Sequence, residues 1–170
     1  MGKGSLRKRR RGSMIDRYGW RSMKTFCGVL LILMLGAVPM WAALGEPEST
    51  VSADGQFLRG QIRDEVHQGY RLHQITDPSG GVIREYVSPA GKVFGISWQG
   101  PFVPNMQQLL GTYFTYVQQY AQAQTGRHSG PLSMQKDDFV FTCGGHMRWR
   151  YGRAYVPSLL PTNLSPEVVQ

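Results

Sequence analysis

The chain has 170 residues, which allows one domain, and its 41% hydrophobic and 18% charged residues suit a globular core. Its formal charge of +8 would suit nucleic acid or an acidic membrane, but residues 1–25 carry nine Lys/Arg against one Asp, and the remainder carries ten residues of each sign. The folded part is therefore expected to be neutral, which argues against a nucleic-acid partner.

Residues 25–45, TFCGVLLILMLGAVPMWAALG, contain no charge. Their apolar centre, residues 29–35, lies between the basic segment and small residues around Pro39, which is the plan of a secretory signal. We predict cleavage after Ala42, so that residues 1–42 are a basic leader and signal peptide, starting either at Met1 or at Met23. The protein would then be periplasmic or secreted; the alternative is an inner-membrane anchor formed by residues 25–45.

Export would remove Cys27 and leave Cys143 as the single thiol of residues 43–170. No internal disulfide is then possible, and the thiol is buried, paired with another molecule, or reactive. Burial is the commonest outcome for a free cysteine.

The first half of the folded part predicts one helix and three strands. Leu58, Ile62 and Val66 recur every four residues, which predicts a short helix within 46–68. Residues 70–76, 82–87 and 92–98 are short runs rich in β-branched and aromatic residues and separated by Pro/Gly turn clusters, which predicts a three-stranded antiparallel meander. In its third strand, Phe94, Ile96 and Trp98 are expected to share one face, and Val93, Gly95 and Ser97 the other.

A longer helix is predicted from Pro104 and Asn105 to Gly126, with Gly111 at a cost of about 1 kcal/mol relative to alanine. Its buried stripe comprises Met106, Leu109, Leu110, Tyr113, Val117 and Tyr120. After a loop at 125–131, strands are expected at 138–143 and 146–151, joined by a hairpin at Gly144 and Gly145. Residues 156–170 contain three prolines and should run extended over the surface.

These elements predict an α+β fold for residues 43–170 as a single domain. An antiparallel sheet of about five strands, a meander plus a C-terminal hairpin, packs against one main amphipathic helix.

Three blocks resemble exported bacterial proteins grouped as domain of unknown function 2844. They are ALG at 43–45, REYVSPAGKVFGISWQGPFVPNMQQLLGTYF at 84–114, and GHMRWRYGRAYVPSLLP at 145–161. The resemblance implies export and a shared fold, and it carries no activity onto any residue.

Cys143 and His146 are the candidate catalytic residues, because an imidazole can activate a thiol as a thiolate. A turn at Gly144 and Gly145 would bring their side chains to one face without any catalytic purpose. No Asp or Asn is assignable as the group that orients the histidine, so no catalytic residue is assigned.

Metal and cofactor sites are not predicted. The four histidines, His67, His73, His128 and His146, lack a ligand spacing. The adjacent carboxylates Asp64–Glu65 and Asp137–Asp138 would point to opposite faces of a strand.

Ligand-binding candidates are Arg148, Arg150 and Arg153 together with the aromatic pair Trp98 and Phe102. In a strand, His146, Arg148 and Arg150 would form a basic row that is either a solvated face or a surface for carboxylate or phosphate groups. The aromatic pair either closes the core or lines a carbohydrate or peptide groove.

We therefore expect an exported, non-catalytic binding or structural module of the cell envelope. Its partner would be an anionic polymer, a peptide or a protein, and it would contact a membrane only through an uncleaved leader. The alternative is a Cys143-dependent thiol enzyme or redox partner.

Overall fold

The computed structural model describes residues 44–124 and 131–170, which belong to one compact unit that extends from Met40 to Gln170. The predicted leader, its cleavage site and most of the 125–131 loop lie outside the described residues. Within the described ranges, no helix is long and apolar enough to cross a membrane.

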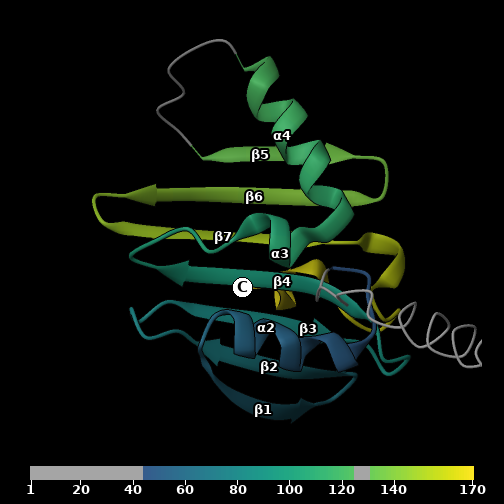
Figure 1. Ribbon diagram of the computed structural model, residues 1–170. Helices are drawn as coiled ribbons and strands as arrows, with labels where there is room; N and C mark the ends of the chain where they lie inside the picture. Colours follow the sequence, from purple (N-terminus) through teal and green to yellow (C-terminus); the bar gives the residue numbers. More distant parts are fainter. Residues whose placement is uncertain (1–43, 125–130) are drawn as a thin grey trace, which may run out of the picture. The chain divides into compact units, whose positions relative to one another are not determined.

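One antiparallel sheet of seven strands, in the order β1-β2-β3-β4-β7-β6-β5, forms the centre of this unit (Figure 1). The pairing of β4 with β7 joins the N-terminal meander to the C-terminal strands. The strands are β1 Gln61–His67, β2 Tyr70–Thr76, β3 Val82–Val87, β4 Val93–Gly100, β5 Leu132–Lys136, β6 Phe139–His146 and β7 Trp149–Tyr155.

The expectation of an α+β fold with an antiparallel sheet is confirmed, but the number of strands is seven instead of about five. The additional strands, β1 and β5, lie at the two edges. Residues 61–67 belong to β1, although the spacing of Ile62 and Val66 predicted a helix. A separation of four residues also keeps two side chains on the same face of a strand, and Val66 is 84% exposed in this edge strand.

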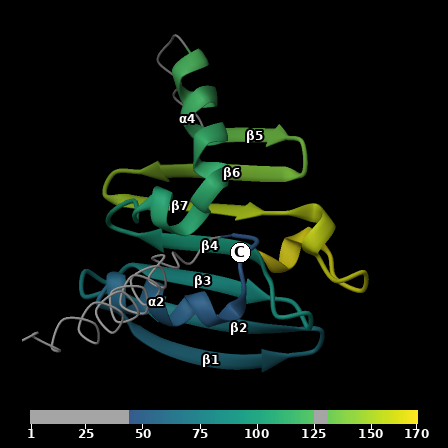
Figure 2. The ribbon, with the colours of Figure 1, turned by 45° about the vertical axis from the view of Figure 1, so that its right-hand side comes forward.

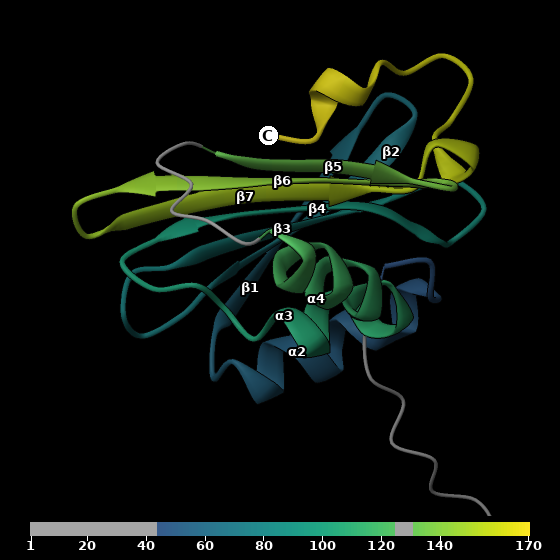
Figure 3. The same ribbon diagram turned by 90° about the horizontal axis from the view of Figure 1, so that it is seen from above.

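The helices α2 Val51–Phe57, α3 Met106–Leu110 and α4 Phe114–Ala123 all lie on one face of the sheet (Figure 3). Figure 2 shows α2 beside the β1–β3 end and α4 across the β5–β7 end. The long helix predicted from 104 is interrupted, because Gly111 has φ +53° and is followed by a 3-10 turn, η2 Gly111–Tyr113. A positive φ disrupts an α-helix, and glycine adopts it without steric cost.

Large apolar side chains fill the space between these helices and the sheet. Tyr113 stacks on Phe139 with ring centroids 4.9 Å apart and an interplanar angle of 16°. The fully buried members of this core include Ile75, Ile83, Val87, Val93, Ile96, Leu109, Leu110, Phe139 and Ala154.

The C-terminal segment covers part of the opposite face of the sheet (Figure 3). It contains two short 3-10 turns, η3 Pro157–Leu159 and η4 Pro166–Val168, and it buries Val169 completely in a second apolar cluster with Leu72, Tyr86 and Phe94. The segment thus runs over the surface of the sheet, as expected, but two 3-10 turns interrupt its extended course and Val169 is part of a core.

A β-bulge in the middle of the sheet separates two neighbouring apolar residues. Val87 pairs with Val93 and Tyr86 pairs with Gly95, so Phe94 is the extra residue of β4. Val93 then packs on the helix side and Phe94 on the side of the C-terminal segment. Ile96 and Trp98 share a face as predicted, but Phe94 does not share it.

Candidate functional site

The β6–β7 hairpin turns at Met147 and Arg148, not at Gly144 and Gly145. His146 pairs with Trp149, and Met147 has φ +51°, as a two-residue hairpin turn requires. The two glycines lie inside β6, opposite Tyr151 and Arg150. A Cβ at Gly144 would lie 2.9 Å from the Tyr151 hydroxyl, and one at Gly145 would lie 2.8 Å from Cδ of Arg150. These glycines therefore make room for larger neighbours.

Because the turn lies at Met147 and Arg148, the two candidate catalytic residues, Cys143 and His146, are separated. Cys143 pairs with Gly152 and packs against the helix-side core, whereas the exposed His146 belongs to the alternate set of β6 side chains. The side chains thus lie on opposite faces of the strand, contrary to the expectation from a Gly-Gly turn. Burial raises the pKa of the Cys143 thiol, although Leu132 N–H and the nearby Arg150 charge lower it in part. The arrangement favours a neutral thiol.

The three arginines do not form one row. Arg148 lies in the turn, Arg150 lies on the helix side, and Arg153 lies on the opposite side, where its Nη1 donates to the Val169 carbonyl oxygen at 3.3 Å. The expected alternation failed because the turn interrupts the strand between His146 and Trp149.

The aromatic pair is also separated. Trp98 is buried and packs on Phe141 with ring centroids 5.7 Å apart. Its indole lies over Gly152, at the position that a Cβ there would occupy. Phe102, by contrast, is 70% exposed and does not line a cavity with Trp98.

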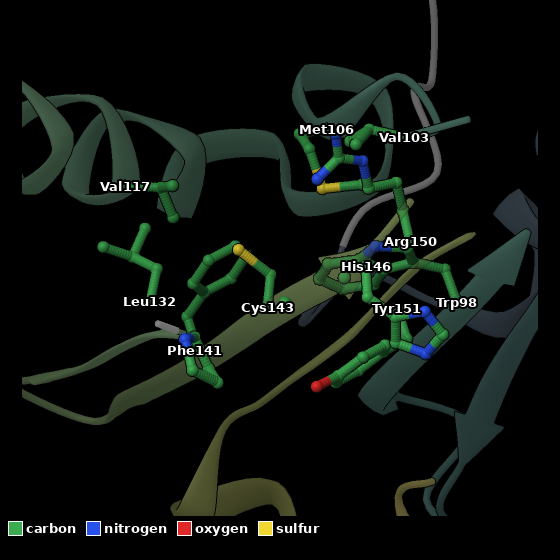
Figure 4. Close-up of a pocket in the computed structure, with 13 residues that line it drawn as sticks. Trp98, Val103, Met106, Val117, Leu132, Phe141, Cys143, His146, Arg150 and Tyr151 are labelled. Atoms are coloured by element: carbon green, nitrogen blue, oxygen red, sulfur yellow. The ribbon is translucent and has the colours of Figure 1, made fainter. Parts of the chain in front are cut away.

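The structure instead brings Trp98, Cys143 and Arg150 together around one cavity of about 640 Å³ on the helix side of the sheet (Figure 4). Leu132, Phe141 and Cys143 lie together on one side of it, and Met106 and Val103 lie beside Arg150. The remaining lining residues are Val117, Pro131, Gly144, Gly145, His146 and Tyr151.

This cavity combines apolar walls with one guanidinium. The cations of the described ion pairs are Arg63, His67, Arg71 and His73. Arg150 forms no ion pair with another described residue. Its charge also acts on the Cys143 thiol. Such a cavity can accept an apolar group that carries an anionic group at the Arg150 end, because the exposed guanidinium of Arg150 can pair with a carboxylate, sulfate or phosphate.

Among the described residues, no group of three or more His, Cys, Asp or Glu could hold a metal ion. His73 is buried between two carboxylates: Nδ1 lies 2.7 Å from Asp64 Oδ1, and Nε2 lies 3.0 Å from Glu48 Oε1. Arg71 also pairs with Glu48 at 2.8 Å. These contacts connect the 3-10 turn η1 Glu48–Thr50 to strands β1 and β2.

A buried carboxyl pair, which the sequence analysis missed, lies next to this network. Glu85 on β3 is 1% exposed and Asp54 on α2 is fully buried. Gln108 Nε2 on α3 donates to Asp54 Oδ1 at 2.6 Å, while Asp54 Oδ2 and Glu85 Oε1 have no partner outside the pair. Because two adjacent buried carboxylates repel each other, we expect the pair to hold a proton. One sequence signal was visible: Glu85 stands between Ile83 and Val87 at a core-facing position of its strand.

Burial raises the pKa of Glu85 well above its ordinary value, and the Asp54 charge raises it further. A raised folded-state pKa contributes stability that is present below the unfolded pKa and is lost as pH rises through the folded pKa. We expect the free energy of unfolding to fall as pH rises above about 4.5.

Glu85→Gln should reduce this pH dependence, because an amide stays neutral and still donates to Asp54. Urea unfolding of the wild type and the variant across about pH 5 to 8 measures it. The matched control is Glu46→Gln, an exposed residue whose substitution should leave the slope unchanged. An equally steep slope in Glu85→Gln would contradict the assignment.

The Cys143 geometry predicts slow alkylation of the folded protein. In a Cys27→Ser variant, iodoacetamide should modify Cys143 more slowly than free cysteine, and the rate should rise at higher pH than for free cysteine, because burial favours the neutral thiol. His146→Ala should leave the rate unchanged. Fast labelling that His146→Ala abolishes would instead show a thiol–imidazole pair.

The chain belongs to the family described as protein of unknown function (DUF2844), whose model matches residues 40–169. The resemblance found in the sequence is thereby confirmed. A comparison with curated proteins finds no match, and a comparison with solved structures finds none either.

Proposed function

We propose that residues 1–42 direct export of the chain and that the folded part is a non-catalytic binding module of the cell envelope. The basic segment, the apolar run and the small residues around Pro39 support export. The position of Cys143 and His146 on opposite faces of β6 supports a role without thiol catalysis, even though both residues border the helix-side cavity, since no hydrogen bond joins the imidazole to the sulfur among the described contacts.

The expected form in the cell is a chain that begins at Ala43. The mass of the intact protein from the periplasmic fraction measures this directly. A chain that begins at Leu44 or Glu46 would still agree with export. A protein that stays in the membrane fraction and keeps residues 25–45 would show an anchor instead.

The binding site that we propose is the helix-side cavity, and the observation that carries it is a single exposed guanidinium, that of Arg150, beside largely apolar walls. Its volume of about 640 Å³ falls within the range of small-molecule sites, roughly 300–1,000 Å³. Trp98, Phe141 and Met106 would contact an aromatic or alkyl group, and Arg150 would bind its acidic group. The ligand class is therefore a small amphiphilic anion, either free or as part of an anionic envelope component.

Anilinonaphthalene sulfonate is a suitable probe, because it joins an aromatic body to one anionic group. We expect the folded protein to bind it with enhanced fluorescence, and Arg150→Gln to weaken binding by roughly threefold to fivefold, since a charge pair at a solvent-exposed group contributes up to about 1 kcal/mol.

Arg148→Gln is the matched control, because it removes the same charge from the exposed turn next to the cavity. Unfolding midpoints of both variants must match that of the wild type, since partly unfolded proteins also bind this dye. Equal affinity of the Arg150 and Arg148 variants would refute the proposed site.

A further inference from the structure

The face of the sheet opposite the helices carries a continuous polar row across its centre. The pairing registers place Arg84 on β3, Ser97 on β4, Arg153 on β7 and Thr142 on β6 side by side. Ser97 is buried and the other three are half-buried. A polar row next to the apolar cluster of Tyr86, Phe94 and Val169 costs free energy unless its groups are satisfied.

Arg84 and Arg153 lie on either side of Ser97, so their Cα atoms are two strand spacings, about 10 Å, apart. Neither arginine takes part in an ion pair of the described residues. Each guanidinium has five N–H donors, and the described contacts account for only one, from Arg153 Nη1 to the Val169 carbonyl oxygen. Two half-buried cations therefore keep most of their donors available.

No acidic side chain lies on this face of the four surrounding strands, β3, β4, β7 and β6, all of which are described. The one acidic residue of those strands that is buried in the sheet, Glu85, faces the helices. The side chains on the Arg84 face are Val82, Arg84, Tyr86, Phe94, Ser97, Gln99, Val140, Thr142, His146, Trp149, Tyr151, Arg153 and Tyr155. The side chains of this face therefore carry a positive charge, which is set against the main-chain carboxylate of Gln170 beside them, although the residues after position 25 are neutral in sum.

A cavity of about 310 Å³ lies over this positive region, lined by Arg84, Gln99, Thr142, Tyr151, Arg153 and Gln170 among others. Its volume is at the lower end of the range for small-molecule sites. The donors are diverse: two guanidinium groups, an amide and two hydroxyl groups. This donor set suits the oxygens of a compact anion.

Gln170 forms one wall of the cavity, and its position is determined by hydrogen bonds. Its main-chain oxygen accepts from the Tyr86 hydroxyl at 2.7 Å and from Ser97 Oγ at 2.9 Å. Tyr86 and Ser97 therefore bind the end of the C-terminal segment, as Arg153 Nη1 does at Val169, and Arg84 and the other donors of Arg153 remain for a ligand.

We propose that this cavity is a binding site for a phosphate group, as inorganic phosphate or as a small phosphate monoester, held between Arg84 and Arg153. Guanidinium groups bind phosphate oxygens through pairs of parallel N–H donors, and a doubly charged anion can engage both arginines at once. Thr142, Tyr151 and Gln99 donate to the remaining oxygens or to the group esterified to them. The site differs from the Arg150 cavity, because β7 presents Arg150 and Arg153 on opposite faces, although Trp98 and Tyr151 border both cavities.

The test is isothermal titration of the protein with inorganic phosphate and with glycerol phosphate at constant ionic strength. We expect Arg84→Gln and Arg153→Gln each to weaken binding at least tenfold, and Arg84→Lys to restore it only in part, since an ammonium lacks the paired donors. Arg84→Gln is the decisive variant. Arg84 makes no described hydrogen bond to the C-terminal segment, so its substitution leaves the hydrogen bonds of that segment intact.

Two controls separate this site from the rest of the chain. Arg63→Gln removes an exposed arginine from the same polar row at the sheet edge, where Glu65 already pairs with it at 3.4 Å. Arg150→Gln removes the cation of the other cavity. Both should bind phosphate like the wild type, and phosphate should not displace anilinonaphthalene sulfonate.

Three outcomes would overturn the proposal. They are absence of phosphate binding, equal phosphate affinity of Arg84→Gln and Arg63→Gln, and loss of phosphate binding when chloride is added to the same ionic strength. The second would assign the binding to other basic residues, such as those of the leader. Preference for glycerol phosphate over inorganic phosphate would identify a monoester as the ligand, and the reverse would identify the free ion.

Discussion

The structure depends on the burial of β4 on both of its faces. This strand pairs with β3 and β7, and Gln99 is its only residue that is not buried. Ile96 and Trp98 need the helices as cover, and Phe94 needs Tyr86 and Val169 of the opposite cluster. The bulge next to Val87 makes this possible, because it lets Val93 and Phe94 enter different cores. The helices and the C-terminal segment are thus both parts of the fold, each covering apolar surface that would otherwise meet water.

The two faces differ in charge, and this difference separates the two cavities. The helix side of the meander buries Asp54, Glu85 and the His73 network, whereas the other side presents Arg84 and Arg153 without acids on the neighbouring strands. The alternation along β7 sends Arg150 to one side and Arg153 to the other. A short basic and aromatic stretch of sequence therefore contributes to two cavities with different ligand chemistry: one with a single guanidinium, and one with two.

Sequence patterns predicted β2 and β3 with their observed ends, and β4 within two residues, because these strands alternate clearly between distinct turn clusters. They missed β1 because a four-residue spacing fits a strand as well as a helix, and they misplaced the hairpin because Gly144 and Gly145 resemble a turn. Those glycines accommodate Tyr151 and Arg150 across the hairpin, which only the register shows. Of the candidate site residues, Trp98, Cys143, His146 and Arg150 border one cavity, while Phe102 and Arg148 lie outside it.

The sequence by itself determined the α+β class, the family, the balance of charge after residue 25 and the apolar stripe of the helix region. These properties follow from composition and local periodicity, which can be read along the chain. The tertiary structure alone decided that Asp54, Glu85 and Gln108 meet in the core, that Cys143 and His146 face apart, and that Arg84 and Arg153 flank one cavity. These relations depend on strand register, on a one-residue bulge and on which layer covers each face of the sheet. A shift of one residue in a strand's register would move its side chains to the opposite face.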